Sequence, residues 1–287
     1  MKNLALLSLI LFIFYSCGSV PVTGRRQLNL VSDAEVLSLS LTEYNEYIKT
    51  AKKSTNSANT AMVTNVGSRI AEAVSAYYKY VGMESELSNF AWEFVLVEDE
   101  QVNAFCMPGG KIVVYTGILP VTKDETGLAV VVGHEVGHAV AKHASERMSQ
   151  QMLAQYGAAG VGAVLGKSSS GVQSVAQTVF GLGAQYGVLA YSRKQELEAD
   201  FLGMVFMGIA GYSPEAALPF WERMAQNGNS APEFLSTHPS DATRIAGIRQ
   251  KLPEAMEYYK AIHGNKTTTT PTQNTNTNTN TNNQWRF

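Results

Sequence analysis

The pentapeptide His134-Glu135-Val136-Gly137-His138 places two imidazoles and a carboxylate at a spacing that suits metal chemistry. Residues four apart on an α-helix share a face, so His134 and His138 can direct nitrogen atoms at one metal ion. Glu135 lies beside them, where it can take a proton from a water held by that metal. With only 5 histidines in 287 residues, a helix that carries this pair by chance is the weaker alternative. The pattern predicts a hydrolytic metal site.

A third ligand must come from elsewhere in the chain, because a catalytic zinc usually has three protein ligands and one open position. Glu196 and Asp200 lie four residues apart at the head of a segment that becomes apolar further on. Buried carboxylates need a partner, and a metal with its ligand histidine provides one. The alternative is a solvated first turn whose acidic residues suit the helix dipole, and Glu198 fits that description.

Several motifs in a fixed order resemble metallopeptidase family 48, the HtpX, CAAX-prenyl-protease and Oma-type gluzincins, and in particular its periplasmic, lipid-anchored bacterial members. The resemblance covers residues 20–253. The motifs that carry it are His134 to His138, Ser192-Arg193 with Glu196-Leu197-Glu198-Ala199-Asp200, Val22-Thr23-Gly24-Arg25 with Gln27-Leu28, Asn103-Ala104-Phe105, Pro108-Gly109-Gly110, Tyr115-Thr116-Gly117, and His238-Pro239 with Arg244.

The resemblance implies a zincin-like α+β fold, mainly helical, with a small β-sheet next to the zinc helix. It also implies that Glu196 is the third metal ligand. Asp200 would orient a ligand histidine by accepting its other ring N–H.

The predicted mechanism uses one Zn²⁺ per chain, held by His134, His138 and Glu196. Such an ion lowers the pKa of a bound water to roughly 7. Glu135 would take the proton, and would later pass it to the leaving amine. Peptide-bond hydrolysis is therefore the expected reaction.

Besides the zinc ion, the tetrahedral oxyanion needs a second donor, for which His238 and Arg244 are the candidates. The alternative reading is a loop histidine and a surface arginine. A further possible role for His238 is to occupy the open zinc position and keep the enzyme latent.

The elements that must position these residues follow from periodicity and capping signals. Ser32 and Glu35 form a predicted capping box that opens a helix towards Lys49. Further predicted helices span about 61–80, 124–151 and 192–210, and two more begin at Pro214 and just before Arg244. Predicted strands span 90–97, 102–105 and 111–116, and 52–60 reads as a polar linker.

Substrate binding is expected at Asn103, Ala104 and Phe105, in the strand region that precedes the zinc helix. An extended peptide that pairs with an edge strand through main-chain bonds is held with little side-chain preference. This predicts broad specificity for unfolded chains. The neighbouring Cys106 reads as a small strand residue near the site.

A segment rich in glycine and alanine, 153–189, follows the zinc helix. It predicts a lid over the active site, with a patch that touches membrane and a packed, mobile helical hairpin as alternatives. Glycine lowers helix stability by roughly 1 kcal/mol relative to alanine, which suits a moving element.

The two ends of the chain do not look like parts of the fold. Residues 1–16 read as a lipoprotein signal peptide, with Cys17 as the lipidated residue and 17–31 as a lipid-anchored linker. An ordinary signal peptide is the alternative. Gly18 after the cysteine favours the periplasmic face of the bacterial outer membrane. Residues 32–264 form the expected peptidase domain, and the Thr/Asn-rich stretch 265–287 is an expected disordered tail.

The net charge is −2, and the sequence has no basic patch, which argues against nucleic acid as a partner. The sequence therefore predicts a zinc endopeptidase that degrades unfolded or misfolded cell-envelope proteins. One alternative is a periplasmic chaperone or assembly factor that keeps zinc for structure. Another is a zinc hydrolase that acts on a non-peptide bond such as a lipid amide.

Overall fold

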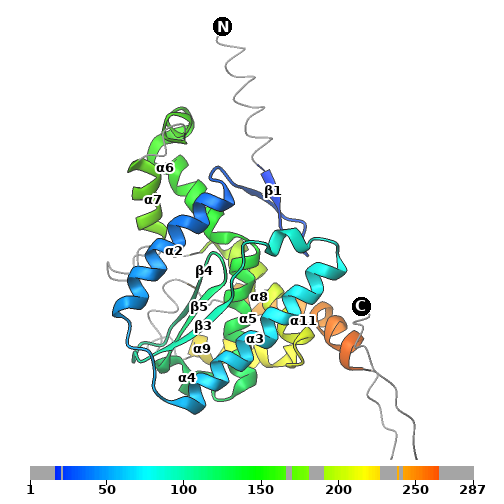
Figure 1. The fold of residues 1–287 in the computed structure, drawn as a ribbon. Coiled ribbons are helices and arrows are strands. Elements are labelled where there is room, and N and C mark those ends of the chain that lie inside the picture. The colour runs from blue at the N-terminus through cyan, green and yellow to red at the C-terminus, as the bar shows by residue number, and fades with distance from the viewer. Residues whose placement is uncertain are drawn as a thin grey trace, which may run out of the picture.

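A small mixed β-sheet lies among helices that cover it on both sides (Figure 1). The computed structural model describes residues 17–20, 22–165, 170–180, 191–226, 238 and 242–264. The predicted α+β fold, mainly helical with a small sheet, is confirmed. In this described part of the chain, no helix has both the length and the apolar character that crossing a bilayer requires. The signal-peptide and tail predictions, 1–16 and 265–287, lie outside the described residues.

The sheet has three strands, β3 (Glu93–Val97), β4 (Ala104–Met107) and β5 (Lys111–Tyr115), in the order β3-β5-β4. β3 pairs with β5 in parallel, and β4 pairs with β5 antiparallel. All three predicted strands are present, although β3 begins three residues later and β4 two residues later than the pattern indicated. β4 is an edge strand of this sheet, as the substrate prediction requires.

Two long helices precede the sheet in sequence, α2 (Asp33–Thr50) and α3 (Ser57–Tyr80). The Ser32 side chain caps α2 as predicted, by accepting from the main-chain N–H of Glu35. α3 begins four residues before the predicted start, because Asn56 caps it by accepting from the N–H of Asn59. The expected polar linker is correspondingly shorter.

Helix α5 (Glu125–Val140) occupies the centre of the molecule and carries both motif histidines. Asp124 caps it by accepting from the N–H of Gly127. Every residue from Gly127 to His138 is buried, which is typical of a helix that is apolar on all sides. It packs against α3, against β4 and most extensively against α8 (Arg193–Ile209).

The axes of α5 and α8 come close together because small residues line their contact. A Cβ atom added at Gly133 would lie 2.9 Å from the carbonyl oxygen of Gly203. One added at Gly137 would lie 2.7 Å from that of Ala199. Both distances are shorter than side chains tolerate, so only glycine lets the backbones approach this far.

The predicted continuous helix 124–151 is wrong: α5 ends at Val140 and α6 (His143–Leu165) begins three residues later. Lys142 between them adopts a left-handed backbone conformation, with φ of 54°. Its amine lies 2.6 Å from an Asp33 carboxylate oxygen and 2.8 Å from one of Glu86. These ion pairs to distant segments hold the turn, which redirects the chain after the motif.

Helix α7 (Ser170–Phe180) lies beside α6 and packs against α2 (Figure 1). Its Val175, Val179 and Phe180 are buried, and Gly157 interrupts α6 with φ of 64°. The predicted helical segment 153–189 is therefore present in part. Residues 166–169 and 181–190 lie outside the described residues, so the lid prediction applies only to α6 and α7 here.

Residues 17–31 do not form the expected linker. Strand β1 (Cys17–Ser19) pairs antiparallel with β2 (Arg26–Leu28), and Val20, Gln27 and Val31 are buried. The prediction is corrected here, because polar and apolar residues of this segment pack directly on the peptidase domain.

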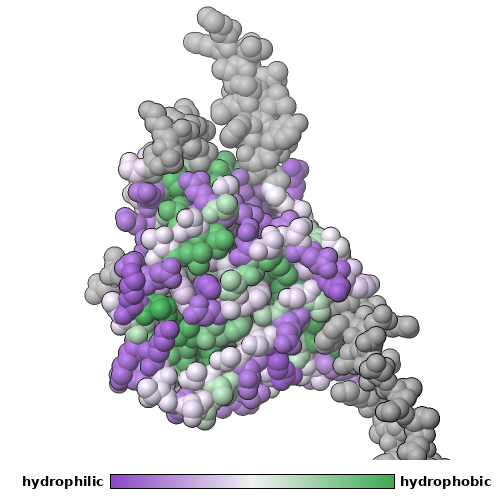
Figure 2. Space-filling model, viewed as in Figure 1, coloured by the Kyte–Doolittle hydropathy of each residue, from purple (hydrophilic) through white to green (hydrophobic). Residues whose placement is uncertain are grey.

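The remaining elements of the described chain are η1 (Glu84–Leu87), η2 (Thr116–Ile118), α4 (Leu119–Thr122), η3 (Pro214–Ala216), α9 (Ala217–Gln226) and α11 (Ala242–His263). Of these, α11 and η3 pack against α8, whereas η1 packs against α3, and α4 against α5. The helix predicted at Pro214 is present as η3 followed by α9, and Ser213 caps it. On the face shown in Figure 2, hydrophilic residues interrupt the apolar ones, so they form scattered patches rather than one continuous band.

Candidate metal centre

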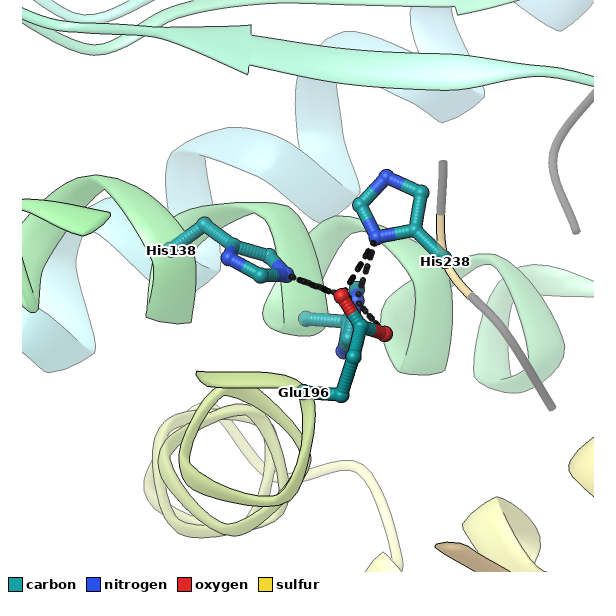
Figure 3. A group of neighbouring side chains, drawn as sticks. His138, Glu196 and His238 are labelled. Atoms are coloured by element: carbon teal, nitrogen blue, oxygen red, sulfur yellow. Dashed lines mark hydrogen bonds and ion pairs between the residues drawn. The ribbon is translucent and has the colours of Figure 1, made fainter. Parts of the chain in front are cut away.

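Four potential metal ligands meet between α5 and α8. His134 and His138 come from α5, Glu196 comes from the first turn of α8, and His238 approaches from the other side (Figure 3). One ligand atom of each residue lies within 4.8 Å of those of the others, and all four side chains are buried. The structure thus brings together the three residues predicted as ligands and one of the two predicted oxyanion donors.

Asp200 fixes the orientation of His134. Its Oδ1 lies 2.9 Å from Nδ1 of His134. Since a carboxylate only accepts, the imidazole proton belongs on Nδ1, and the Nε2 lone pair faces the other ligands. This is the position that the resemblance implied for Asp200.

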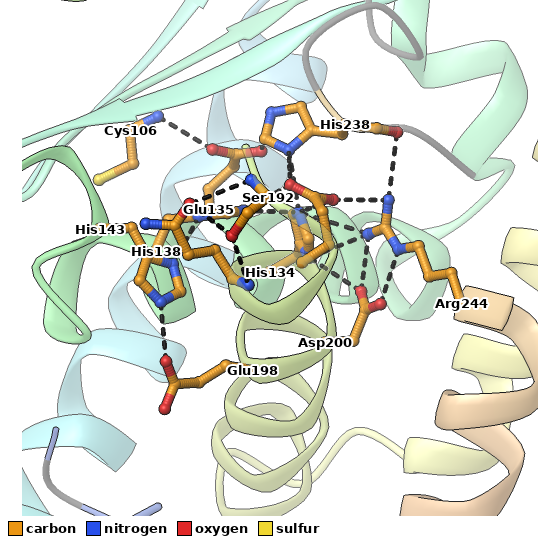
Figure 4. Close-up of polar contacts among 12 residues, drawn as sticks. Cys106, His134, Glu135, His138, His143, Ser192, Glu198, Asp200, His238 and Arg244 are labelled. Carbon is orange, nitrogen blue, oxygen red and sulfur yellow. Dashed lines mark hydrogen bonds and ion pairs between the residues drawn. The ribbon is translucent and has the colours of Figure 1, made fainter. Parts of the chain in front are cut away.

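A second chain of contacts fixes His138 in the same way (Figure 4). Nε2 of His143 lies 2.9 Å from Oε2 of Glu198, and Nδ1 of His143 lies 2.8 Å from Nδ1 of His138. The carboxylate places the His143 proton on Nε2, so its Nδ1 accepts from His138 Nδ1–H. The Nε2 lone pair of His138 therefore also faces the other ligands. Glu198 is buried, so its interpretation as a solvated helix-dipole residue is wrong.

The donor atoms fit a metal ion better than they fit one another. Nε2 of His134 and Nε2 of His138 are 3.0 Å apart, and two lone pairs at that distance cannot form a hydrogen bond. Five distances between the ligand nitrogen and oxygen atoms of the group lie between 3.0 and 3.6 Å. An ion bound tetrahedrally at about 2.0–2.1 Å, as zinc is, has ligand atoms roughly 3.3 Å apart. The cluster can therefore hold such an ion with little rearrangement.

Arg244 balances the negative charge on the far side of the cluster. Its Nε and Nη2 each lie 2.7 Å from an Asp200 oxygen, and its Nη1 lies 2.8 Å from Oε2 of Glu196. It also stacks at 3.6 Å over the Trp221 ring. Burial raises the pKa of Glu196, but the charges of Arg244 and His238 outweigh it and hold that pKa well below its usual range. Both carboxylates are therefore ionised and available as acceptors.

Glu135 points from α5 towards strand β4. Its Oε2 accepts from the main-chain N–H of Cys106 at 3.1 Å, while the buried Oε1 has no hydrogen-bond partner. Burial raises the pKa of Glu135 to about 7, although the charge of His238 acts in the opposite direction. A buried acceptor of this kind suits a group that exchanges a proton near neutral pH.

A cleft runs between the edge strand β4 and the start of α6. The residues that line it are Asn103, Ala104, Phe105, Cys106, Met107, Pro108, Tyr115, Glu135, Ala144, Arg147, Val179, Phe180, Tyr191 and His238. The three predicted substrate-binding residues are among them, and so is His238. Arg244 does not line the cleft, because its guanidinium binds Asp200 and Glu196 behind the cluster. These contacts suit a residue that positions the carboxylates rather than the predicted oxyanion donor.

The N-terminal segment supplies contacts that the motif analysis missed. Thr23 Oγ1 donates to Glu198, and Arg25 Nε lies 2.6 Å from Oε2 of the same carboxylate. Arg25 also pairs with Glu146 at 2.8 Å. Burial raises the pKa of Glu198, yet hydrogen bonds from His143, Thr23 and Arg25 hold it below its usual value. The only sequence signal for this was the Val22-to-Arg25 motif of the family resemblance.

Tyr191 is a second site residue that periodicity did not reveal. Its ring stacks on that of His138 with a centroid distance of 3.9 Å, and the Arg147 guanidinium lies 4.2 Å from the Tyr191 ring centre. Neither residue belongs to a motif: Arg147 lies on α6, and Tyr191 lies two residues before α8 begins. Together they form the wall of the cleft next to His138.

Comparison with known proteins agrees with this geometry. The mitochondrial metalloendopeptidase OMA1 of Schizosaccharomyces pombe is 35% identical over 82% of this chain and 66% of its own length. The protein of the same name from Saccharomyces cerevisiae is 30% identical over 87% of this chain and 73% of its own. The beta-barrel assembly-enhancing protease of Yersinia pestis is 31% identical over 56% of this chain and 34% of its own. The chain thus spans only part of each of these relatives.

Residues 60–252 match the model of peptidase family M48. That range covers more than half of the 287 residues and includes the zinc-motif helix, the edge strand, α8 and Arg244. The expected zincin-like metallopeptidase fold is thereby confirmed. The chain belongs to peptidase family M48.

Proposed function

We propose that this protein is a zinc-dependent endopeptidase that hydrolyses peptide bonds of unfolded or misfolded cell-envelope proteins. The observation that carries the proposal is the distance of 3.0 Å between Nε2 of His134 and Nε2 of His138, whose lone pairs face the same point. Glu196 supplies the third ligand there, and Glu135 lies beside the group. Zinc bound to these three ligands would polarise a substrate carbonyl and lower the pKa of water.

Glu135 moves the proton in this mechanism. Its side chain lines the cleft, its Oε1 lies 3.5 Å from Nε2 of His238, and burial raises its pKa to about 7. It accepts a proton from the attacking water and delivers it to the nitrogen of the leaving amine, while the N–H of Cys106 holds its Oε2 in place. A structural metal site in a chaperone needs no such base, so Glu135 favours the peptidase over that alternative.

His238 fills the fourth corner of the ligand group in this arrangement. Its Nδ1 lies 3.1 Å from Nε2 of His134 and 3.2 Å from Oε1 of Glu196. Of its two predicted roles, the geometry favours the latent one, in which the imidazole occupies the position that substrate and water need. Cleavage then requires His238 to leave the group.

The substrate class follows from the edge strand. Strand β4 lies at an edge of the sheet beside Glu135, and an extended peptide that pairs with its main chain is held without regard to most side chains. Such a site accepts only chain that is already unfolded. The proposed envelope location rests on Cys17 behind the predicted signal peptide. The Yersinia pestis relative, a beta-barrel assembly-enhancing protease by name, supports a protein substrate.

Metal analysis together with casein digestion tests the proposal. We expect about one zinc per chain, and digestion that a chelator abolishes and added zinc restores. The Glu135→Gln variant keeps the metal ligands, so it should retain zinc and lose digestion. Zinc-free protein that still cleaves casein, or unchanged cleavage by the Glu135→Gln variant, would contradict the mechanism.

A further inference from the structure

Arg147 is a buried cation in the wall of the cleft, and most of its N–H groups have no hydrogen-bond acceptor. Its side chain is 4% exposed, and neither Nε nor Nη1 has a hydrogen-bond partner. Only Nη2 makes a hydrogen bond, a long one of 3.5 Å to the carbonyl oxygen of Val179. Among the residues that the structure describes, no carboxylate forms an ion pair with it.

The helix that carries Arg147 aims it towards the site. Arg147 lies four residues after His143 on α6, so the two share the face that packs beneath His138. The ring of Tyr191 lies between Arg147 and His138 and stacks with both. The guanidinium therefore borders the same cleft as Glu135 and strand β4.

An unpaired guanidinium at this depth is costly, because it keeps its charge at any physiological pH and has lost most of its water. Stacking on Tyr191 and one carbonyl oxygen offset only part of that cost. The group that completes such a site best is a carboxylate, which can accept two parallel N–H bonds from the planar fork. The apolar neighbours Val179 and Phe180 would strengthen this pairing by excluding water.

We propose that Arg147 forms a carboxylate-binding subsite of the cleft, which selects substrate segments that place an acidic side chain or a free C-terminal carboxylate there. This inference rests on the proposed peptidase function. It adds a preference for a carboxylate in the substrate, whereas pairing with the edge strand alone would give little preference for particular side chains. The two carboxylate sources share one chemistry and differ only in where the peptide ends.

A matched peptide set tests the proposal with the full-length zinc-loaded protein. Each quenched fluorescent peptide carries Glu or Gln at one position that is moved along a neutral sequence, with either a free or an amidated C-terminus. We expect at least one Glu position, or the free C-terminus, to lower KM about tenfold relative to its neutral twin, because a charge-assisted pair between guanidinium and carboxylate is stronger than a hydrogen bond to a neutral amide. The peptide whose KM falls shows whether the subsite takes an acidic side chain or a free C-terminal carboxylate.

Variants of Arg147 separate recognition from structure. Arg147→Met should bring the acidic peptide to the KM of its neutral twin, so that the ratio of the two KM values becomes about one. Arg147→Lys should keep part of the preference, since it retains the charge and loses the fork. Equal KM values for all twins with the wild type, or equal losses for both twins in Arg147→Met, would overturn the proposal.

A binding measurement keeps this test separate from that of the peptidase function. Zinc-loaded Glu135→Gln protein is titrated with the same acidic and neutral peptides, and tighter binding of the acidic twin is expected without any cleavage. If the wild type cleaves nothing while this difference persists, the proposed reaction fails and the subsite stands. If cleavage occurs and no binding difference is found, the subsite fails alone.

Discussion

Nδ1 of His143 lies 2.8 Å from Nδ1 of His138, on the side of the imidazole opposite to the metal-facing nitrogen. A metal ligand is thus oriented by another histidine, which is in turn held by Glu198. Such an arrangement sets the tautomer of the ligand and raises its basicity towards a metal.

The His143→Ala variant should therefore bind zinc about 10–100-fold more weakly, as is typical when a group that orients a ligand is lost. Competition with a coloured chelator measures this directly. His263→Ala is the matched control, since His263 lies on α11, where it contacts the carbonyl of Gly208 and the Tyr259 ring and is not part of the ligand group. Equal zinc affinity of both variants would show that His143 does not orient the site.

Removal of Arg244 should destabilise the protein strongly. Arg244→Met leaves the buried carboxylates of Asp200 and Glu196 without their cation, and breaking a buried ion pair this way costs about 3–5 kcal/mol. Denaturant unfolding of the metal-free protein measures the loss. Arg249→Met on the same helix removes an exposed pair with Glu222 and should change stability by less than about 1 kcal/mol. Similar values for the two variants would exclude the proposed charge balance.

His238→Ala should raise basal casein cleavage, because it removes the imidazole that fills the fourth corner beside Glu196 and His134. Zinc should stay bound through the other three ligands. The initial rate per zinc ion is the quantity to compare with the wild type. A variant with full zinc content and a lower rate would instead assign His238 to the oxyanion, the other role that the sequence left open.

The metal-free protein should lose stability in mild acid. Burial lowers the pKa of His134 from 6.5 to about 4, the charge of Arg244 acts in the same direction, and Asp200 opposes both. As the pH falls from 6.5 towards 4, the unfolded chain takes up a proton that the folded chain excludes, so the free energy of unfolding decreases. Burial also lowers the pKa of His143, against the opposing effect of Glu198, so His143 adds to the trend.

Thermal unfolding of chelator-treated protein across this pH range checks the expectation. The midpoint should fall between pH 6.5 and 4, and should keep falling below pH 4, where the unfolded chain protonates carboxylates such as Glu196 whose pKa is held down in the folded protein. A midpoint that stays constant over this range, or rises, would contradict the assignment of His134 as a neutral, buried imidazole.

Much of the centre could be predicted because its residues follow helical spacing. His134 and His138 share a face of α5, and the placement of Glu196 and Asp200 on one face of α8 follows from the same rule. The edge position of β4 was also anticipated. These features depend on local periodicity, which a single sequence displays.

The outer layer of the site could not be predicted, because it depends on a turn. His143 lies five residues after His138, which on a continuous helix is about 140° away from it. Only the left-handed conformation of Lys142 brings it back, and that turn is held by Asp33 and Glu86 from distant segments. The contacts of Arg25 and Arg147 follow from the same turn, so no spacing rule revealed them.

The close approach of α5 and α8 at Gly133 and Gly203 has a consequence for how the centre is loaded. The distance between the histidine pair and Glu196 is set by backbone contact between two helices, and does not depend on an ion to draw them together. An emptied centre should keep its shape and refill without refolding. Exchange of the ion should then be limited by its passage into the cleft rather than by movement of the two helices.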